Sequence, residues 1–233
     1  MIYLSIDDTD TLTSRGTGKL ARGIADTLAK DYPVYGVTRH QFFVHPDIPF
    51  TSHNSNAMIH VDAAGSEAAD HIFAVAQEEI LADFVEGSDP GIAVAWPEQV
   101  APALVVFGQE AKRAIVTQKQ ARAIASNLGI RHRGLGGTED GIIGAVAGLG
   151  LVVTGNDGRF LQVGKIREIA CPCSAAQVFA AGVDMISTLD GTTFTEGTIT
   201  AREGKPPRPC PVNGKTVLFV ESSDGVLKEI QRD

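Results

Sequence analysis

Three carboxylates within four residues are the side chains of this sequence best suited to chemistry. Asp7, Asp8 and Asp10 directly follow the apolar run of residues 2–6, which is long enough to form a buried strand. Ligands of open α/β sheets gather beyond the carboxyl ends of strands. Carboxylates this close repel one another unless a cation lies among them, and Mg²⁺ suits such ligands because it is often shared with substrate phosphates. The spacing predicts metal or phosphate chemistry, with capping of the next helix by Asp10 as the equal alternative.

A glycine-containing loop follows these carboxylates and leads into a predicted helix at residues 19–29. Backbone N–H groups and the helix dipole favour an anion there, and Arg15 and Lys19 would add positive charge that assists catalysis. The loop is not a P-loop, because Thr13 stands at the first glycine position and Leu20 follows the lysine. The residues that we expect to bind phosphate in this loop are Arg15, Gly16, Thr17 and Gly18.

A second glycine loop lies at residues 131–141, the most basic short stretch of the chain. Its flexible backbone precedes a predicted apolar helix, which favours binding of an anion. The alternative is a helix C-cap at Gly129, followed by a glycine-rich helix that packs closely on a neighbour. The anion-binding interpretation assigns phosphate contacts to Arg133, Gly134, Gly136, Gly137 and Thr138.

Polar residues around the loop at 45–56 are candidates for orienting a substrate, since small amides and hydroxyls in loops often do so. The candidates are His40, Ser52, Asn54 and Asn56. The same side chains also commonly satisfy their own backbone in turns, and a structural histidine is more common than a catalytic one. The cysteines Cys171, Cys173 and Cys210 are too few for a four-ligand zinc ribbon, which favours free thiols.

Hydrophobic periodicity predicts an α/β protein with a soft boundary near residue 165, separating a body at 1–165 from a small β-rich segment at 166–233. The first two strands and the intervening helix indicate a βαβ unit with a parallel strand pair. A break near Thr117 would cap a second helix within residues 103–128, and residues 155–158 read as a hairpin turn. The predicted strands are 2–6, 34–37, 57–61, 92–95, 151–153, 159–163 and 217–220, and the predicted helices are 19–29, 66–85, 103–128, 138–149 and 174–181.

Composition narrows the function classes. The 233 residues include 28 acidic and 20 basic side chains, and this excess of acid disfavours a broad nucleic-acid-binding face. Aromatic residues make up 6%, which disfavours base-stacking platforms. No apolar run is long enough to cross a bilayer, so we expect no membrane association. The acidic start is unlike a secretion signal, which predicts a cytoplasmic protein.

An ordered series of motifs over residues 1–155 resembles the N-terminal half of the archaeal isoleucine-tRNA agmatinylcytidine synthetase (TiaS) family. The IDDTD start and the order of the later segments carry most of the resemblance. The matching segments are Ile6-Asp7-Asp8-Thr9-Asp10, Ser14-Arg15-Gly16, Pro46-Asp47-Ile48-Pro49-Phe50-Thr51, Asp89-Pro90-Gly91, Arg133-Gly134 and Gly141-Ile142-Ile143-Gly144-Ala145.

The resemblance implies a kinase-like α/β domain with a ferredoxin-like domain, and ATP and Mg²⁺ as cofactors. It implies that Asp7, Asp8 and Asp10 hold Mg²⁺ with the ATP phosphates. Two departures are evident. Ungapped matching puts Lys19 where the family has its phosphate-accepting threonine, a place that Thr17 could take only with a shift, and about 70 C-terminal residues are too few for the family's OB-fold and zinc ribbon. We therefore expect no tRNA modification by this chain without a partner chain.

The combined prediction is Mg²⁺–ATP-dependent activation of a substrate by phosphoryl or nucleotidyl transfer, with an amine such as agmatine as a candidate acceptor. Lys19, Arg15 and Arg133 would stabilise charge on the transferring group. The alternatives are a non-catalytic nucleotide- or polyamine-binding module, or one subunit of a split tRNA-modifying enzyme. A homodimer is left open.

Overall fold

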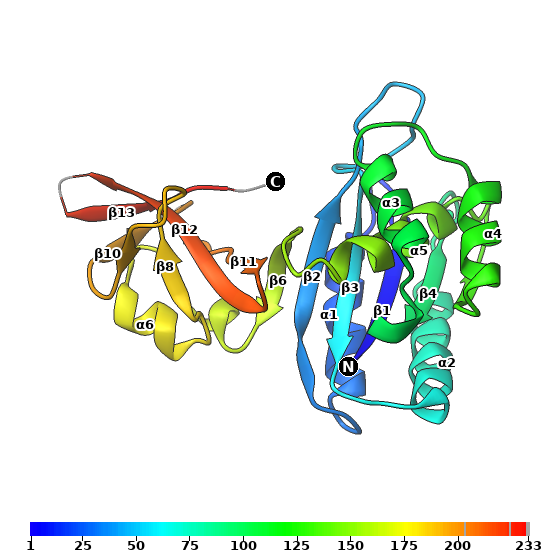
Figure 1. The fold of residues 1–233 in the computed structure, drawn as a ribbon, viewed down its shortest axis with the longest axis horizontal. Coiled ribbons are helices and arrows are strands. Elements are labelled where there is room, and N and C mark those ends of the chain that lie inside the picture. Colours follow the sequence, from blue (N-terminus) through cyan, green and yellow to red (C-terminus); the bar gives the residue numbers. More distant parts are fainter. Residues whose placement is uncertain (203, 224, 232–233) are drawn as a thin grey trace. The chain divides into compact units, whose positions relative to one another are not determined.

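The computed structural model describes residues 1–202, 204–223 and 225–231, and divides into two compact units. Unit 1 comprises Met1–Thr154 and unit 2 comprises Gly155–Asp233 (Figure 1). The division falls before the boundary expected near residue 165. Among the described residues, no helix is long and apolar enough to span a membrane.

Unit 1 is a mixed α/β structure in which β1 lies at the centre of the sheet, with strands in the order β5-β4-β1-β3-β2. β1 pairs antiparallel with both β3 and β4. The elements are β1 (Ile2–Asp7), α1 (Thr17–Leu28), β2 (Val34–Gln41), β3 (Ser55–Val61), α2 (Ser66–Ala82), β4 (Gly91–Ala95), α3 (Pro102–Ala111), α4 (Gln118–Asn127), β5 (Arg131–Gly134) and α5 (Gly141–Val152), with a short 3-10 helix, η1, at Pro97–Gln99.

The first two strands are parallel, as the pattern predicts, but they are not neighbours. β3 lies between β1 and β2 and pairs antiparallel with each of them. The βαββαβ path from β1 to β4 is therefore a split βαβ arrangement of the ferredoxin-like type. The predicted α/β (α+β) fold class is confirmed, while the expected adjacency of the parallel pair is wrong because β3 returns between them.

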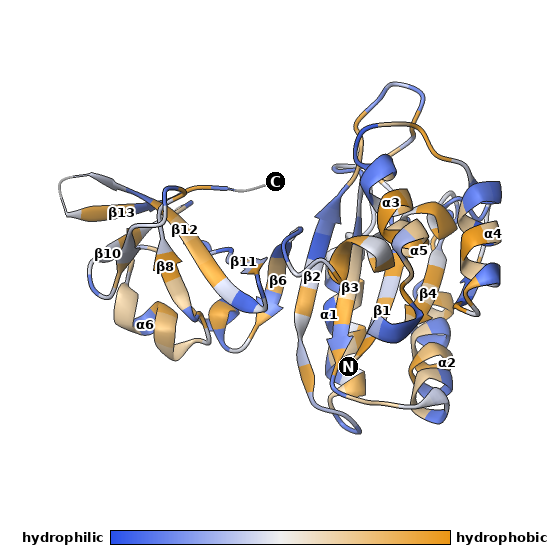
Figure 2. Cartoon of the chain, in the orientation of Figure 1, coloured by the Kyte–Doolittle hydropathy of each residue, from blue (hydrophilic) through white to orange (hydrophobic). Residues whose placement is uncertain are grey.

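Helices cover both faces of this sheet. Figure 1 shows α1 and α2 on one face and α5 on the other, with α3 and α4 outside α5. Side chains alternate along β1, so Leu4 and Ile6 are buried on the face opposite to Ser5 and Asp7. The central strands and α5 are mostly hydrophobic (Figure 2), as expected for elements enclosed on both sides.

α5 lies so close to its neighbours that only glycine fits at several of its positions. A Cβ at Gly148 would lie 1.8 Å from Asn56 Nδ2, and one at Gly150 would lie 2.1 Å from the Leu104 carbonyl oxygen in α3. Such distances are far inside van der Waals contact, so α5 lies directly against the Asn56 side chain on the sheet side and against the backbone of α3 on the other side. The close-packed glycine-rich helix that was the alternative interpretation is what the structure contains here.

Two boundaries predicted around α5 and α4 have different outcomes. Residues 151–152, predicted to open a strand, form the last part of α5, so no hairpin joins them to residues 159–163. A short apolar run does not distinguish strand from helix, and burial on all sides let α5 continue. The predicted break near Thr117 is confirmed, because Thr117 Oγ1 accepts a 3.3 Å hydrogen bond from the backbone N–H of Gln120 at the start of α4.

Unit 2 is rich in β-structure, as predicted. Its strands follow the order β7-β10-β13-β12-β8-β9, with β11 paired to β12. Cys171, Cys173 and Cys210 are buried and form no disulfide within the described part of the chain, and burial raises the pKa of Cys171 to about 12. Its elements are β6 (Arg159–Val163), η2 (Ile166–Glu168), β7 (Cys173–Ser174), α6 (Ala175–Ala180), β8 (Met185–Ser187), β9 (Thr193–Phe194), β10 (Thr198–Thr200), β11 (Cys210–Val212), β12 (Lys215–Ser223) and β13 (Val226–Glu229).

Candidate functional site

One end of the unit 1 sheet collects the chain segments that carry the predicted chemistry. β1 ends there at Asp7, which is paired with Gly91 at the start of β4, and Gly91 is in turn paired with Gly134 at the end of β5. The helices α1 and α5 both begin at this end, so their positive N-terminal dipoles lie close to the same place.

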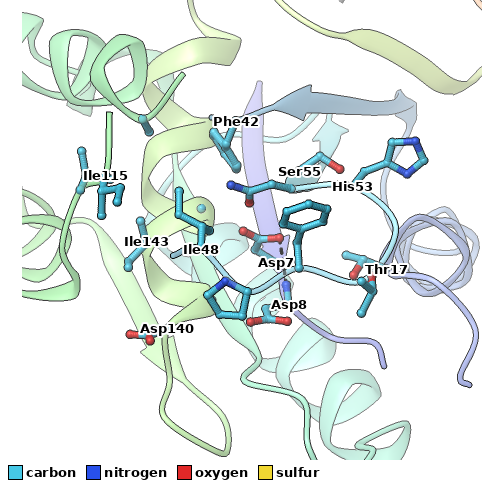
Figure 3. A pocket seen from close by; sticks show the side chains of 18 of the residues that line it. Asp7, Asp8, Thr17, Phe42, Ile48, His53, Ser55, Ile115, Asp140 and Ile143 are labelled. Carbon is cyan, nitrogen blue, oxygen red and sulfur yellow. Dashed lines mark hydrogen bonds between the residues drawn. The ribbon is translucent and has the colours of Figure 1, made fainter. Parts of the chain in front are cut away.

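A cavity of about 210 Å³ opens at this end of the sheet. Figure 3 shows Asp7 and Asp8 between two contrasting walls: Ile115, Ile143 and Ile48 lie on one side, and Thr17 and His53 on the other. Its lining includes five aspartates, Asp7, Asp8, Asp10, Asp47 and Asp140, together with the imidazole of His53. The lining consists of Asp7, Asp8, Asp10, Thr17, Phe42, Asp47, Ile48, Pro49, Phe50, Thr51, His53, Asn54, Ser55, Ala111, Ala114, Ile115, Val116, Asp140, Gly141, Ile143 and Gly144.

Asp7 is the deepest of these carboxylates. Burial raises its pKa well above the ordinary value, and the charges of Asp8 and Asp10 raise it further, although the Asp8 backbone N–H donates a 2.9 Å hydrogen bond to Asp7 Oδ1. The carboxylate lies against α5 where Gly144 leaves space, since a Cβ at that position would stand 1.6 Å from Asp7 Oδ2. Burial at this position therefore disfavours the ionised form of Asp7, and a bound cation would favour it.

Asp8 lies at the turn that follows β1. Its φ of 52° is in the left-handed region, which aspartate and asparagine tolerate better than most residues. Its pKa is raised from 3.8 to about 6. Burial is the largest cause, and the negative charges of Asp89, Asp10 and Asp140 contribute in that order. Four carboxylates from three separate chain segments therefore act on one another here, although only two of them are neighbours in the first loop.

Asp10 connects the first loop to α1 and to the β2–β3 loop. Its Oδ1 accepts a 2.9 Å hydrogen bond from Thr17 Oγ1, and its Oδ2 accepts a 3.1 Å bond from Thr51 Oγ1. The N-cap residue of α1 is Gly16, and no side chain caps its backbone N–H groups. The helix-capping alternative for Asp10 is therefore wrong; the Lys19 N–H donates a 2.7 Å hydrogen bond to the Gly16 carbonyl oxygen, which leaves the N–H groups of Thr17 and Gly18 to face a ligand.

The predicted cationic residues lie outside the cavity. Arg15 is exposed and pairs with Asp83, with 2.8 Å between Nε and Oδ2, and Lys19 is exposed on α1. Arg133 donates a 2.7 Å hydrogen bond to Gln77 on α2 and lies over Phe73. Among the residues that the structure describes, no lysine or arginine lines the cavity.

The second glycine loop encloses a carboxylate that belongs to the protein itself. The backbone N–H of Thr138 donates to Asp89 Oδ1, and a Cβ at Gly137 would overlap the same oxygen at 2.0 Å. A Cβ at Gly134 would meet the Glu139 side chain, and one at Gly136 would meet Phe84. The Thr138 N–H predicted for phosphate thus already has an anionic partner.

Of the residues predicted to orient a substrate, only Asn54 lines the cavity; its Nδ2 donates a 2.7 Å hydrogen bond to the Phe43 carbonyl oxygen. His40 is buried within β2, 3.0 Å from Thr38 Oγ1. Asn56 is buried beneath α5 and donates a 2.8 Å hydrogen bond to Ser5 Oγ. Ser52 is exposed next to His53.

Asp140 and Asp47 line the cavity but were not among the predicted site residues. Asp140 directly precedes α5, and Gln118 Nε2 holds its carboxylate with a 3.0 Å hydrogen bond. The sequence does show a carboxylate directly before an apolar glycine-rich helix, but acidic residues are common at helix starts, so this pattern alone does not indicate a site. Its nearness to Asp8 depends on the β1–β4–β5 pairing.

The carboxylate oxygens of this cavity suit a Mg²⁺ ion that is also bound by the phosphates of a nucleotide. Within residues 1–202, 204–223 and 225–231, no group of three or more His, Cys, Asp or Glu side chains is arranged to hold a metal ion. Mg²⁺ commonly takes one or two protein carboxylates and completes its shell with phosphate oxygens and water. Asp7 and Asp8 meet that smaller requirement, and the pKa of each is raised first by burial and then by neighbouring carboxylates, an environment in which a bound cation would favour the ionised forms.

Comparison with known proteins shows a fold that has been seen before. No protein-family model and no curated protein matches the chain. Among solved structures, apo TiaS, a tRNAIle2 agmatidine synthetase, matches with a TM-score of 0.55 and 23% identity over 64% of this chain and 35% of that chain. The TiaS–tRNA(Ile2)–ATP complex matches equally well over 64% and 36%, and the TiaS–tRNA(Ile2)–AMPCPP–agmatine complex with a TM-score of 0.52 and 23% identity over 63% and 35%.

The match thus spans about a third of the TiaS chains, and at this identity it establishes likeness of fold. The covered share of this chain is close to that of unit 1, which has 154 of the 233 residues. The resemblance read from the motifs and the similarity of the folds therefore point to the same proteins, and the chain has the fold of part of a TiaS structure.

Proposed function

We propose that unit 1 binds Mg²⁺–ATP at the end of β1 and activates a substrate by phosphoryl or nucleotidyl transfer. The observation that carries this proposal is the set of mutually repelling carboxylates around Asp8, beside the first turns of α1 and α5. A cation relieves that repulsion, and phosphates suit the uncapped N–H groups of α1. The ATP and AMPCPP complexes of TiaS, which has this fold, support the choice of nucleotide.

In this proposal Asp7 and Asp8 hold Mg²⁺, which would neutralise phosphate charge when bound, and Asp10 orients the first turn of α1 through Thr17. The backbone at Gly16, Thr17 and Gly18 faces the phosphates. Gly144 leaves the space that the Asp7 carboxylate occupies. The apolar wall excludes water from one side of the cavity, which strengthens electrostatic interactions with the transferring group.

The acceptor that fits these surroundings is a cationic amine, because the charged lining of the cavity is acidic. One TiaS structure contains agmatine, an amine of this type. We assign substrate orientation to Asn54, which reaches the cavity. The remaining residues predicted for the site lie outside the cavity and would contact a ligand only after a rearrangement. They are Arg15, Lys19, Arg133, Gly134, Gly136, Gly137, Thr138, His40, Ser52 and Asn56.

A second candidate function is nucleotide or amine binding without turnover. None of the lysines and arginines that the structure describes lines the cavity, whereas phosphoryl transfer depends on positive charge at the transferring group. Lys19 also replaces the threonine that the TiaS family phosphorylates. A split enzyme, in which a partner chain supplies the missing residues and handles tRNA, accounts for the same observation.

Calorimetry with ATP, in the presence and absence of Mg²⁺, tests the proposal. We expect Mg²⁺-dependent binding that Asp8→Asn weakens by at least about tenfold, or about 1.4 kcal/mol. The matched control is Asp62→Asn, an exposed aspartate just after Val61, which pairs with Ile2 at the opposite end of β1. The absence of Mg²⁺-dependent binding, or equal binding by the Asp8 variant, refutes the proposed site.

ATP consumption with a panel of amines then distinguishes the two candidates. Turnover that depends on agmatine or another polyamine supports the transferase reading, whereas binding without turnover supports the sensor reading.

A further inference from the structure

The loop between β2 and β3, residues 42–54, has a base that is held by backbone hydrogen bonds. The Phe42 N–H donates a 2.8 Å hydrogen bond to the Asn54 carbonyl oxygen, and Asn54 Nδ2 donates a 2.7 Å hydrogen bond to the Phe43 carbonyl oxygen. The Phe43 N–H donates a 2.9 Å hydrogen bond to the Ala111 carbonyl oxygen at the end of α3. These bonds join the two ends of the loop to each other and to α3, so the base can stay in place when the tip moves.

The tip of this loop, residues 46–51, covers the cavity, and we call it the flap. Most of its residues line the cavity, namely Asp47, Ile48, Pro49, Phe50 and Thr51. The cavity volume of about 210 Å³ is below the roughly 300–1,000 Å³ of sites that enclose a whole small molecule. A whole nucleotide therefore does not fit beneath the flap in the position that the structure shows, and the flap must open for the proposed ligand to enter.

Thr51 joins the flap to the first turn of α1 through Asp10. Thr51 Oγ1 donates a 3.1 Å hydrogen bond to Asp10 Oδ2, and Thr17 Oγ1 donates a 2.9 Å hydrogen bond to Asp10 Oδ1. Thr9 Oγ1 extends this chain with a 3.1 Å hydrogen bond to Thr17 Oγ1, and both of these threonines are buried. Because Thr17 is the first residue of α1, one carboxylate connects the position of the flap to the N–H groups that open this helix.

We propose that Thr51 is a positioning residue, which latches the flap over the bound ligand and fixes the first turn of α1 through Asp10. The inference rests on the proposed function, because the ligand held in this way is Mg²⁺–ATP. With the latch closed, each Asp10 oxygen has a hydroxyl donor, so the carboxylate holds Thr17 in one orientation toward the phosphates. Closure also places the apolar side chains of Ile48 and Phe50 around the site, where they exclude water.

Limited proteolysis of the nucleotide-free protein tests the latch. Phe50 is 43% exposed, and cleavage by chymotrypsin after this residue reports how often the flap opens. Thr51→Val keeps the shape of the side chain but loses the hydroxyl, and we expect it to speed this cleavage about tenfold, since the lost hydrogen bond has a charged acceptor. Thr51→Ser restores the hydroxyl and should be cleaved at the wild-type rate.

The matched control is Thr27→Val. It removes a bond of the same kind, the 3.0 Å hydrogen bond from Thr27 Oγ1 to Glu79 Oε1, which joins α1 to α2 and lies at the other end of α1 from Thr17. This variant should be cleaved after Phe50 at the wild-type rate, because the flap keeps its latch.

Release of nucleotide tests the positioning role. The probe is ATP with an N-methylanthraniloyl group on its ribose, bound with Mg²⁺, and we expect it to dissociate about tenfold faster from Thr51→Val than from wild type, Thr51→Ser or Thr27→Val. Equal cleavage of wild type and Thr51→Val, failure of Thr51→Ser to restore either rate, or equal dissociation overturns the proposal. Faster cleavage of Thr51→Val in a protein that binds no Mg²⁺–ATP would refute the proposed function and leave the latch between Thr51 and Asp10 standing.

Discussion

Replacing Asp8 with asparagine should stabilise unit 1 at neutral pH while weakening its binding of Mg²⁺–ATP. The pKa of Asp8 is raised from 3.8 to about 6 by burial and by Asp89, Asp10 and Asp140. A carboxyl group with a raised pKa costs stability when it ionises in the folded state. That cost is absent below about pH 4, grows as the pH rises through 6, and is complete at pH 7.5.

The size of the effect follows from this pKa. At 1.36 kcal/mol per pKa unit, the change from 3.8 to about 6 corresponds to about 3 kcal/mol. Asp8 is only partly buried and solvent screens its charge, so we expect about 1–2 kcal/mol. For a unit of 154 residues, this raises the melting temperature by roughly 3–6 °C. Asparagine also suits the left-handed φ of 52°, so the backbone adds little to the change.

The single tryptophan, Trp96, follows β4 and allows the unfolding of unit 1 to be monitored by fluorescence. Thermal melts of wild type and Asp8→Asn at pH 7.5 and pH 4 provide the measurement, with Asp62→Asn as the control that should shift neither melt. We expect a gain at pH 7.5 that nearly disappears at pH 4. An equal rise in melting temperature at both pH values, or no rise at pH 7.5, would show that ionisation of Asp8 does not destabilise the folded protein.

Three further predictions concern packing, titration and division of the chain. Burial lowers the pKa of His60 to about 3, so the contribution of this residue to stability is lost as the pH falls below about 6.5. Urea titrations should therefore show that the difference in free energy of unfolding between wild type and His60→Gln shrinks between pH 7 and pH 4.5. Gly144→Ala places a Cβ 1.6 Å from Asp7 Oδ2 and should cost about 1–3 kcal/mol in the same titration, whereas Gly23→Ala, where nothing lies within 4 Å in the middle of α1, should gain up to about 1 kcal/mol. Residues 1–154 should fold alone with the circular dichroism of a mixed α/β protein, and an unfolded fragment would contradict the division into two units.

Local patterns predicted most helices and strands of unit 1, but not β5, whose residues were read as part of a glycine loop, nor the end of α5, nor the neighbours of each strand. The hydrophobic pattern of residues 2–61 indicates β1, α1, β2 and β3 directly, and Thr117 was recognisable as the N-cap of α4. Whether β1 pairs with β2 or with β3 depends on contacts between distant segments, and nothing within either strand specifies them. Asp140 became part of the site for the same reason, since only the pairing of β4 and β5 brings it beside Asp8.

Charge was also easier to locate than to pair. The carboxylates of the first loop line the cavity, as their spacing at a strand end predicts. The basic residues of the glycine loops did not reach it, because Asp83 and Gln77 offered Arg15 and Arg133 partners nearer to solvent. A sequence shows that a cation is available, whereas its choice among competing acceptors depends on the fold.

The close contacts of α5 make one part of the site rigid and leave two loops as the adjustable part. Gly141 lies against the backbone of β4 and Gly150 against the backbone of α3, so a displacement of this helix toward either neighbour would bring backbone atoms into contact. The helix is therefore a rigid support beneath the carboxylates. Changes in the shape of the cavity that accommodate different ligands must come from the loop at residues 42–54 and the connection at 112–117. Attempts to alter specificity should vary those two segments and leave α5 untouched.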